Sequence, residues 1–243
     1  MKIICMIPAR LNSKRVIKKN LRLINGRPLI SYVLETISKC SCFNDIYLNS
    51  ESEIFRDIAN KYNISFYKRD KRFSTDKIQN DDFALDFMNK IPGDILIQVL
   101  PTSPFITATE INGFTKQMIE KRLDTQVSVE HKKIACLYND VPINFNKYKI
   151  VPPSQEVEPV KSYATVLMGW KYNNYKENMR KYGAGYHGSE GKIGYYELRG
   201  LSTLDIDREE DFHLVERIIL SRKTNIKIKK RYYNGKKASN WNK

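Results

Sequence analysis

The sequence predicts an α/β protein built on a doubly wound, mostly parallel sheet. Short apolar runs alternate with segments of helical periodicity, which is the pattern of strands joined by crossover helices. Two of these runs, Lys2–Ile7 and Asp94–Leu100, are almost entirely apolar, as expected for strands that are buried on both faces. At 243 residues, the chain is long enough to form one good-sized core.

The elements follow one another along the chain in a regular order. Strands are predicted at Lys2–Ile7, Asp45–Asn49, Ile64–Tyr67, Asp94–Leu100, Gln126–Glu130 and Ser162–Trp170. Helices are predicted at Leu29–Lys39, at Arg208–Ser221, and in three stretches that end near Tyr62, Lys90 and Arg122. Pro28 suits the first turn of the first helix, and Ser50–Glu53 and Thr107–Glu110 have the spacing of capping boxes. The five glycines in Lys181–Gly194 indicate a flexible loop, either a lid or a simple connector.

Composition excludes some classes of protein. The net charge of +15 raises nucleic acid as a partner, but the basic residues are spread along the chain and acidic residues interleave with them. Only the tail Lys227–Lys243 is densely basic, and a solvated end explains it better than RNA binding. No apolar run approaches the roughly 18 residues of a membrane span, and no signal peptide precedes the first strand, so a cytoplasmic protein is expected. The four cysteines lack CxxC spacing, which favours free thiols.

A basic loop follows the first strand. It carries five cations, namely Arg10, Lys14, Arg15, Lys18 and Lys19. Open α/β sheets bind ligands at the carboxyl ends of their strands, and several cations gathered there suit a polyphosphate. The alternative is an ordinary solvated charge run. Neither the P-loop nor the dinucleotide fingerprint is present.

A second polar feature lies near the C-terminus. Asp205 and Asp207 flank Ile206, so both carboxylates point to one face of an extended segment. Two carboxylates on one face can hold Mg²⁺, which prefers oxygen ligands and keeps water or phosphate in its shell. Alternatively, Asp207 with Glu210 fits an N-cap arrangement for the following helix, and the two roles are compatible.

The sequence IPARLNSKRVIKKN, Ile7 to Asn20, resembles the opening signature of the cytidylyltransferases that activate acidic sugars, such as the CMP-sialic acid synthetases. Pro101–Phe105 (PTSPF) and Asp205–Asp207 (DID) resemble two further signatures of that family. The resemblance implies a Rossmann-like nucleotidyltransferase fold over residues 1–225, CTP as substrate and Mg²⁺ as cofactor. It also implies a homodimer formed through an extended arm within residues 135–170. Residues 226–243 are then a basic tail.

The resemblance also implies roles for individual residues. It places CTP against Ala9, Arg10, Asn12, Ser13, Lys14, Lys19, Asn20, Arg69, Asp76 and Asn80. Arg69 is expected near the base or ribose, whereas Asp76 and Asn80 are equally explained by a surface loop that ends in a helix cap. Arg10, Lys14 and Lys19 are expected to stabilise the departing pyrophosphate, and Asp205 and Asp207 to hold the catalytic magnesium.

The acceptor side departs from the family pattern. Leu100 stands where many sialic acid enzymes have Gln, and Ala164 stands where they have the Arg that pairs with the sugar carboxylate. Candidate acceptor residues are Leu100, Thr102, Ser103, Lys161 and Tyr163, with Lys132 and Lys133 as further cations. The expected acceptor is a sialic-acid-like nonulosonate or a related 2-keto-3-deoxy sugar acid. The alternatives are a cytidylyltransferase for 3-deoxy-octulosonate or for an acceptor that is not a sugar acid, and a catalytically silent nucleotide- or RNA-binding relative.

Overall fold

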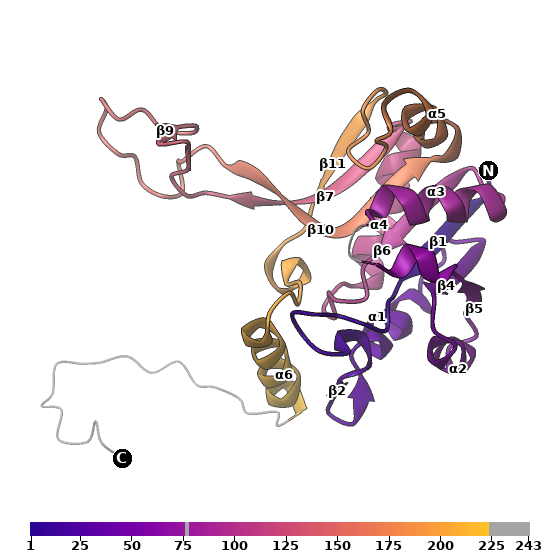
Figure 1. Cartoon of the computed structure of the whole chain (residues 1–243). Helices are drawn as coiled ribbons and strands as arrows, with labels where there is room; N and C mark the ends of the chain where they lie inside the picture. Colours follow the sequence, from indigo (N-terminus) through magenta and orange to yellow (C-terminus); the bar gives the residue numbers. More distant parts are fainter. Residues whose placement is uncertain (76–77, 224–243) are drawn as a thin grey trace, which may run out of the picture.

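A seven-stranded sheet forms the centre of the molecule. The computed structural model describes residues 1–75 and 78–223 (Figure 1). The strands lie in the order β11-β7-β10-β6-β1-β4-β5, and of these only β10 runs antiparallel to its neighbours. Their bounds are β1 Ile3–Pro8, β4 Asp45–Ser50, β5 Ser65–Lys68, β6 Ile95–Val99, β7 Thr125–Lys132, β10 Val160–Lys171 and β11 Ile193–Glu197. The predicted mostly parallel sheet is confirmed.

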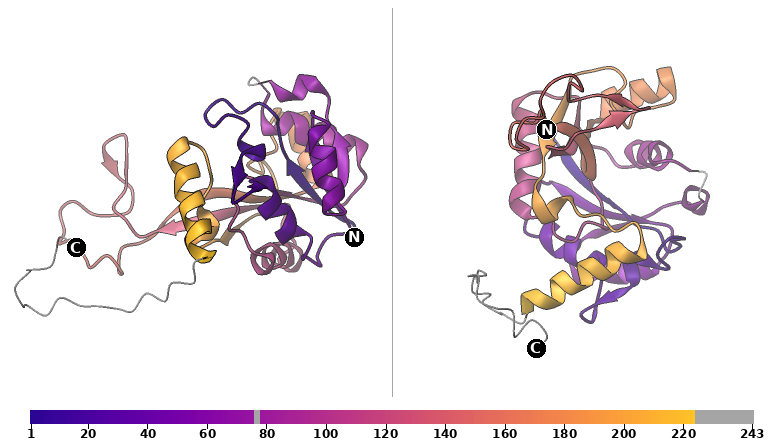
Figure 2. Two further views of the ribbon diagram at one scale, coloured as in Figure 1. Left: turned by 90° about the horizontal axis from the view of Figure 1, so that it is seen from below. Right: turned by 90° about the vertical axis from the view of Figure 1, so that its left-hand side faces the viewer.

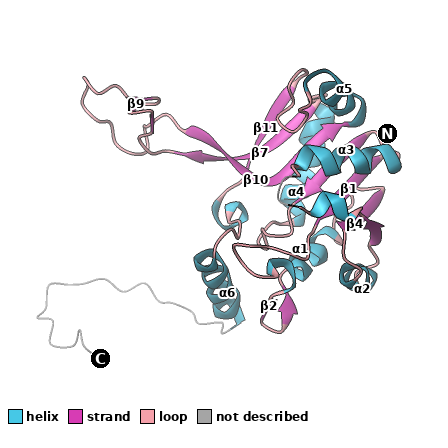
Figure 3. Cartoon of the chain, in the orientation of Figure 1, coloured by secondary structure: helices cyan, strands magenta, loops and turns pink. Residues whose placement is uncertain are grey.

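Helices cover both faces of this sheet (Figure 3). One core contains Ile3, Cys5 and Ile7 of β1 and is covered by α1 (Ile30–Ile37), α2 (Ile54–Lys61) and α4 (Ala108–Glu120). The other contains Ile4 and Met6 and is covered by α3 (Asn80–Lys90) and α5 (Tyr172–Tyr182). Because successive side chains of a strand point to opposite faces, β1 has to be apolar at every position to fill both cores. The doubly wound arrangement is therefore confirmed.

A third apolar cluster lies beyond the sheet and holds the last described helix. Helix α6 (Glu209–Lys223) packs against the loop after β1 and against the hairpin of β2 (Leu23–Ile24) and β3 (Arg27–Pro28). The buried members of this cluster are Val16, Ile24, Leu29, Phe105, Ile206, Phe212, Val215 and Ile219. Burying Ile206 against Val16 brings the DID segment beside the basic loop, although the two are far apart in sequence.

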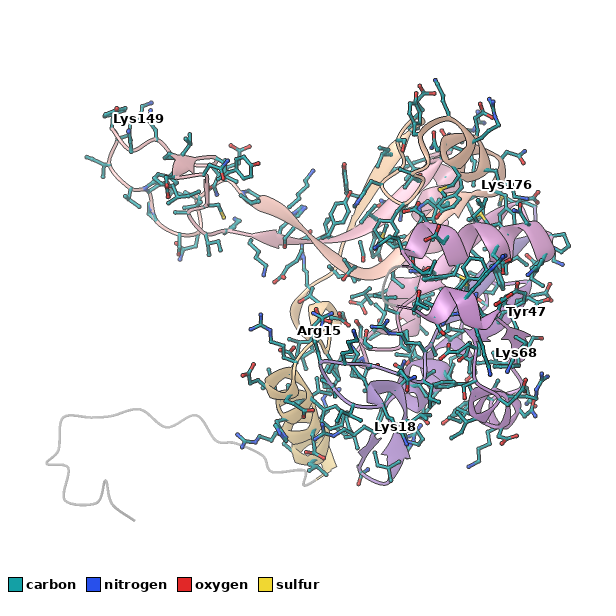
Figure 4. All side chains as sticks on the ribbon, in the orientation of Figure 1. Arg15, Lys18, Tyr47, Lys68, Lys149 and Lys176 are labelled. Atoms are coloured by element: carbon teal, nitrogen blue, oxygen red, sulfur yellow. The ribbon has the colours of Figure 1, made fainter. Side chains whose placement is uncertain are left out.

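An arm leaves the body between β7 and β10 and contains the small hairpin β8 (Leu137–Tyr138) and β9 (Val141–Pro142) (Figures 1 and 2). Lys149 lies at its far end (Figure 4). Many of its apolar side chains are exposed, among them Ile134, Leu137, Tyr138, Val141, Ile143, Tyr148, Ile150 and Val151. The extended part ends before Val160, where the chain joins the sheet as β10.

Two local predictions near the first two helices are wrong. Pro28 lies in β3, whose hairpin turns at Asn25 and Gly26 with φ values of 51° and 73°. Asn-Gly is the preferred pair for such a turn, because it tolerates positive φ at both positions. Helix α2 begins only at Ile54, and the Glu53 carboxylate binds Arg56 and Lys68 and makes no capping box with Ser50.

The Thr107–Glu110 capping box of α4 is confirmed, with each side chain bonded to the other's backbone N–H. Helix α5 and strand β11 were not predicted from the sequence. The apolar face of α5 consists largely of tyrosines, which weakens a helical hydrophobic pattern. The glycine-rich loop connects α5 to the sheet edge, and its Gly185 and Tyr186 N–H groups donate to Asp81 Oδ1 at 2.7 and 2.8 Å. In this structure, the loop is thus bonded to α3.

The cysteines are free thiols, as expected. Of the helices described, none has the length and apolar character needed to cross a lipid bilayer. Asp76 and the basic tail 226–243 lie outside the described residues.

Candidate active site

A cleft of about 290 Å³ opens at the carboxyl edge of the parallel strands. It lies where β1, β5 and β6 end, as expected for an open α/β sheet. The predicted residues that line it are Ala9, Arg10, Ser13, Lys14, Lys19, Asn20, Arg69, Asn80, Leu100 and Thr102. Asn12 lines a neighbouring cavity together with Glu51. The structure therefore brings most of the predicted nucleotide residues to one place.

A buried ion pair fixes the start of the basic loop. Arg69 Nη2 donates to Glu51 Oε2 at 3.0 Å and to the carbonyl oxygen of Ala9 at 2.9 Å. Glu51 Oε1 in turn accepts the Leu11 N–H at 2.7 Å. Arg69 is only 3% exposed, and its guanidinium lies 5.0 Å from the centre of the Phe83 ring. Burial lowers the pKa of Arg69, and Glu51 opposes this shift. The pair thus holds the backbone on both sides of Arg10.

Three buried polar atoms of cleft residues have no hydrogen-bond partner within the described part of the chain. They are Arg69 Nε, Asn80 Nδ2 and Asn20 Oδ1. Buried polar groups are normally paired, and unpaired ones are costly. Two donors and one acceptor of cleft residues are therefore left without a partner among the described residues.

The DID segment is held in place by the PTSPF turn. The Ile206 N–H donates to the Thr102 carbonyl oxygen at 3.1 Å, and Ser103 Oγ donates to Asp205 Oδ1 at 3.3 Å. Ile206 itself is fully buried. With this residue fixed, Asp205 is held by Ser103, and Asp207 lies beside Arg15 and Lys19, which line the cleft.

The basic loop and the acidic pair meet at Lys19. Its ammonium donates to the Ile206 carbonyl oxygen and lies 3.7 Å from Asp207 Oδ1. Arg15 Nη2 lies 2.9 Å from the same carboxylate oxygen. Burial lowers the pKa of Lys19, while the charges of Asp205 and Asp207 oppose that shift. The charges of both aspartates thus favour the protonated form of Lys19.

The N-cap arrangement considered for Asp207 and Glu210 is wrong. Helix α6 begins at Glu209, one residue later than expected, and Asp211 receives the N–H groups of Asp207 and Arg208 at 2.9 and 2.8 Å. The Asp207 carboxylate faces Arg15 and Lys19.

Asp205 and Asp207 are the two carboxylates on which the predicted magnesium site depends. Within residues 1–75 and 78–223, no three His, Cys, Asp or Glu side chains are grouped as metal ligands. Two carboxylates beside a basic cleft suit Mg²⁺, because it usually takes one or two carboxylates and fills its shell with water and phosphate oxygens.

The candidate acceptor residues are divided between two places. Leu100 and Thr102 line the cleft, whereas Lys161 and Tyr163 lie on β10 at the base of the arm. The Tyr163 ring lies 5.5 Å from that of His187 in the glycine-rich loop. Lys161 Nζ lies 5.5 Å from the Tyr195 ring.

The other two candidate cations and Ala164 lie in the same region. Lys132 pairs with Glu130, and Lys133 donates to the Gln155 carbonyl oxygen. Ala164 is buried beside Thr165, whose positive φ of 55° marks a bulge in β10.

Three residues at the site received no individual role from the sequence. Arg15 is one of the cations of the basic loop, and its place in that loop was the sequence signal for a role at the site. Glu51 follows β4 directly, at the sheet edge where ligands bind, and Phe83 lies on the face of α3 that reaches the cleft. These three residues are distinguished by contacts with residues that are distant in the sequence, which the sequence alone does not show.

Comparison with known proteins identifies the family. A family model described as "Cytidylyltransferase" matches residues 4–238. The chain belongs to the cytidylyltransferase family. It is 30% identical over 234 residues to the N-acylneuraminate cytidylyltransferase of Escherichia coli O18:K1:H7, covering 88% of this chain and 51% of that protein. It is 33% identical over 133 residues to the pseudaminic acid cytidylyltransferase of Campylobacter jejuni, covering 52% of this chain and 55% of the relative.

This cytidylyltransferase chain thus spans about half the length of these relatives. Its fold is similar to that of CMP:2-keto-3-deoxy-manno-octonic acid synthetase complexed with CTP, with a TM-score of 0.69 at 16% sequence identity. The superposition covers 91% of this chain and 100% of that structure.

Proposed function

We propose that this cytidylyltransferase transfers CMP from CTP to a hydroxyl group of an acidic sugar and releases pyrophosphate. The observation that carries the proposal is the meeting of the basic loop and the acidic pair at Lys19, in a cleft at the carboxyl edge of the sheet. The relatives support the substrate class, since their names specify N-acylneuraminate and pseudaminic acid.

In the proposed reaction, an oxygen of the acceptor forms a bond to the α-phosphorus of CTP. The bond from that phosphorus to the bridging oxygen breaks, pyrophosphate leaves with the electron pair, and the hydroxyl proton passes to solvent. Arg10, Lys14 and Lys19 would neutralise the charge that develops on the leaving group. Catalysis of this kind depends mostly on positioning and charge stabilisation.

Asp205 and Asp207 would hold Mg²⁺. When bound, this ion would neutralise phosphate charge and lower the pKa of the attacking hydroxyl. Ser103 would orient Asp205, since its hydroxyl donates to that carboxylate. Lys19 would keep the DID segment aligned with the basic loop through its bond to Ile206.

The unpaired buried atoms of the cleft support a polar nucleotide ligand. Arg69 Nε and Asn80 Nδ2 are donors that would suit a carbonyl oxygen or ring nitrogen of the base, or a ribose oxygen. On the acceptor side, Leu100 and Thr102 would form the wall nearest to the nucleotide, and Tyr163 and Lys161 the more distant wall.

The test is a measurement of pyrophosphate release from CTP and Mg²⁺ across a panel of acidic sugars. The panel contains N-acylneuraminate, other nonulosonates, 3-deoxy-octulosonate and a hydroxyl compound without a carboxylate. We expect release with a carboxylate-bearing acceptor and formation of the matching CMP-sugar. GTP in place of CTP is expected to give at least a tenfold lower rate, because a site that hydrogen-bonds one base leaves buried groups unpaired with another.

Two outcomes would contradict this proposal. Pyrophosphate release with the acceptor that lacks a carboxylate, but with none of the acids, would refute the acidic sugar as acceptor and leave CTP as the nucleotide substrate. Failure of CTP to raise the thermal unfolding midpoint of the protein would refute CTP as a ligand as well, because any ligand of the native state stabilises it.

We further propose that the arm joins two copies of this chain. Its exposed apolar side chains include Tyr148, Ile150 and Val151, which are 86%, 96% and 81% exposed. Ile150 and Val151 also line a largely apolar groove of about 410 Å³, together with residues such as Phe145, Pro152 and Val157. Apolar patches of this kind mark interaction sites, and a symmetric pair of arms would cover both grooves at once.

The substitution Ile150→Asp tests this pairing. It is expected to weaken the dimer roughly tenfold or more, because a charge would replace an apolar side chain at the centre of the contact. Sedimentation at several protein concentrations measures the effect. Leu214→Asp on α6 is the control, since Leu214 is also exposed, at 48%, but lies away from the arm. A wild-type chain that sediments as a monomer throughout would refute the proposal.

A further inference from the structure

Arg15 and Lys19 share one carboxylate oxygen of Asp207. Arg15 Nη2 lies 2.9 Å from Asp207 Oδ1, and Lys19 Nζ lies 3.7 Å from the same atom. In Figure 4, Arg15, which belongs to the loop after β1, lies near the beginning of α6. One acidic oxygen therefore has two cationic neighbours.

The two cations are held differently. The Lys19 side chain is only 14% exposed, and its ammonium also donates to the Ile206 carbonyl oxygen, so it stays in place without Asp207. The Arg15 side chain is 66% exposed and reaches Asp207 from the solvent side. Exposed ion pairs contribute little free energy and exchange readily. Arg15 is therefore the partner that can leave.

Arg15 also lines the cleft that would hold the triphosphate. A guanidinium binds phosphate at least as well as carboxylate, because its donors match two oxygens of either group. A triphosphate carries more negative charge than one aspartate, so it would compete effectively for this side chain. Arg15 thus has two available positions, one on Asp207 and one on phosphate.

We propose that Arg15 is an exchangeable counter-ion: it covers Asp207 in the nucleotide-free protein and moves to the phosphates when CTP binds, which frees Asp207 for the divalent cation. This inference rests on the proposed function, because it takes Asp207 as a metal ligand and CTP as the ligand of the cleft. Its consequence is positive coupling, in which CTP raises the affinity for the metal ion and the metal ion raises the affinity for CTP by the same factor.

The substitution Arg15→Gln tests the proposal without turnover. Mn²⁺ serves as the probe and is titrated by electron paramagnetic resonance in the absence of nucleotide. Removing the competing cation is expected to tighten Mn²⁺ binding roughly two- to five-fold, the range of an exposed ion pair. CTP binding in EDTA is expected to weaken about three- to ten-fold, because one charge-assisted phosphate contact is lost. The coupling between CTP and Mn²⁺ should fall accordingly.

Arg199→Gln is the matched control. Arg199 is 82% exposed and pairs with Glu197 at 2.9 Å, so this substitution removes the same charge from a similar surface pair that does not involve Asp207. Arg15→Lys keeps the positive charge and is expected to retain most of the coupling. Added salt should reduce the difference between Arg15→Gln and wild type, since the pair is exposed to solvent.

The outcomes separate this inference from the proposed function. Tighter Mn²⁺ binding in Arg15→Gln, but not in Arg199→Gln, supports the exchange. Equal Mn²⁺ affinity in Arg15→Gln and wild type, including no detectable binding to either, overturns it. This titration requires neither an acceptor nor turnover. An absence of pyrophosphate release would therefore refute the proposed activity and leave the Mn²⁺ result valid.

Discussion

Asp207→Ala is expected to lower the rate of pyrophosphate release by on the order of 10²-fold or more, the effect of removing one electrostatic stabiliser from an active site. In the proposed function, Asp207 is one of the two metal ligands. Its side chain is 48% exposed, and its carboxylate pairs with the exposed Arg15 and with Lys19, which is also bonded to the Ile206 carbonyl oxygen. The free energy of unfolding should therefore change little. Steady-state rates with saturating CTP, together with urea denaturation, measure both quantities.

Glu209→Gln is the control for this variant. Glu209 lies two residues away, is also 48% exposed, and pairs with Arg22, away from Lys19. It is expected to keep the wild-type rate within a factor of about two, since surface substitutions away from such features have small effects. An Asp207→Ala variant that retained near-full activity would eliminate the metal assignment for this residue.

Arg69→Met is expected to lower the free energy of unfolding by about 3–5 kcal/mol, because it leaves Glu51 as a buried charge without its partner. The side chains of Arg69 and Glu51 are 4% and 10% exposed, so water cannot readily replace the lost contact. The same change removes the hydrogen bond that Arg69 donates to the Ala9 carbonyl oxygen. CTP affinity should fall as well, because the basic loop loses one of its two attachments. Urea denaturation and CTP titration measure these effects.

Two further variants make this prediction specific. Glu51→Gln combined with Arg69→Met removes the unpaired charge and is expected to recover part of the lost stability without restoring CTP affinity. Arg72→Met is the control, since Arg72 is exposed and lies 3.8 Å from Asp70, and it should change the free energy of unfolding by no more than about 0.5 kcal/mol. A loss below about 1 kcal/mol in Arg69→Met would show that the pair does not fix the loop.

Elements with strong local patterns were predictable from the sequence. The almost entirely apolar residues of β1 and β6 identified the strands at the centre of the sheet, since a strand covered on both faces requires apolar side chains at nearly every position. The Thr107–Glu110 capping box gave the start of α4, because both partners lie within one turn. Local signals were misleading at Ser50 and Pro28, where β5 and the β2–β3 hairpin supplied competing partners.

The candidate site could be predicted in part. The basic loop and the acidic pair each stood out in the sequence, but nothing local indicates that Lys19 touches Ile206. That contact depends on the third apolar cluster, which packs α6 against the loop after β1. Glu51 is a further example. Its role depends on contacts with Arg69, which follows β5, and with Leu11, which lies in the loop after β1.

The sequence by itself determined the class of the fold, the family and the charged residues available for chemistry, because these depend on periodicity and on short contiguous signatures. Only the tertiary structure decided which charges meet. It paired Arg15 with Asp207, buried Arg69 against Glu51, and made Asp211 the acceptor of the two N–H groups that precede α6. The physical reason is that an ion pair acts over a few ångströms, and burial of distant apolar residues, here Ile206 and Val16, sets those distances.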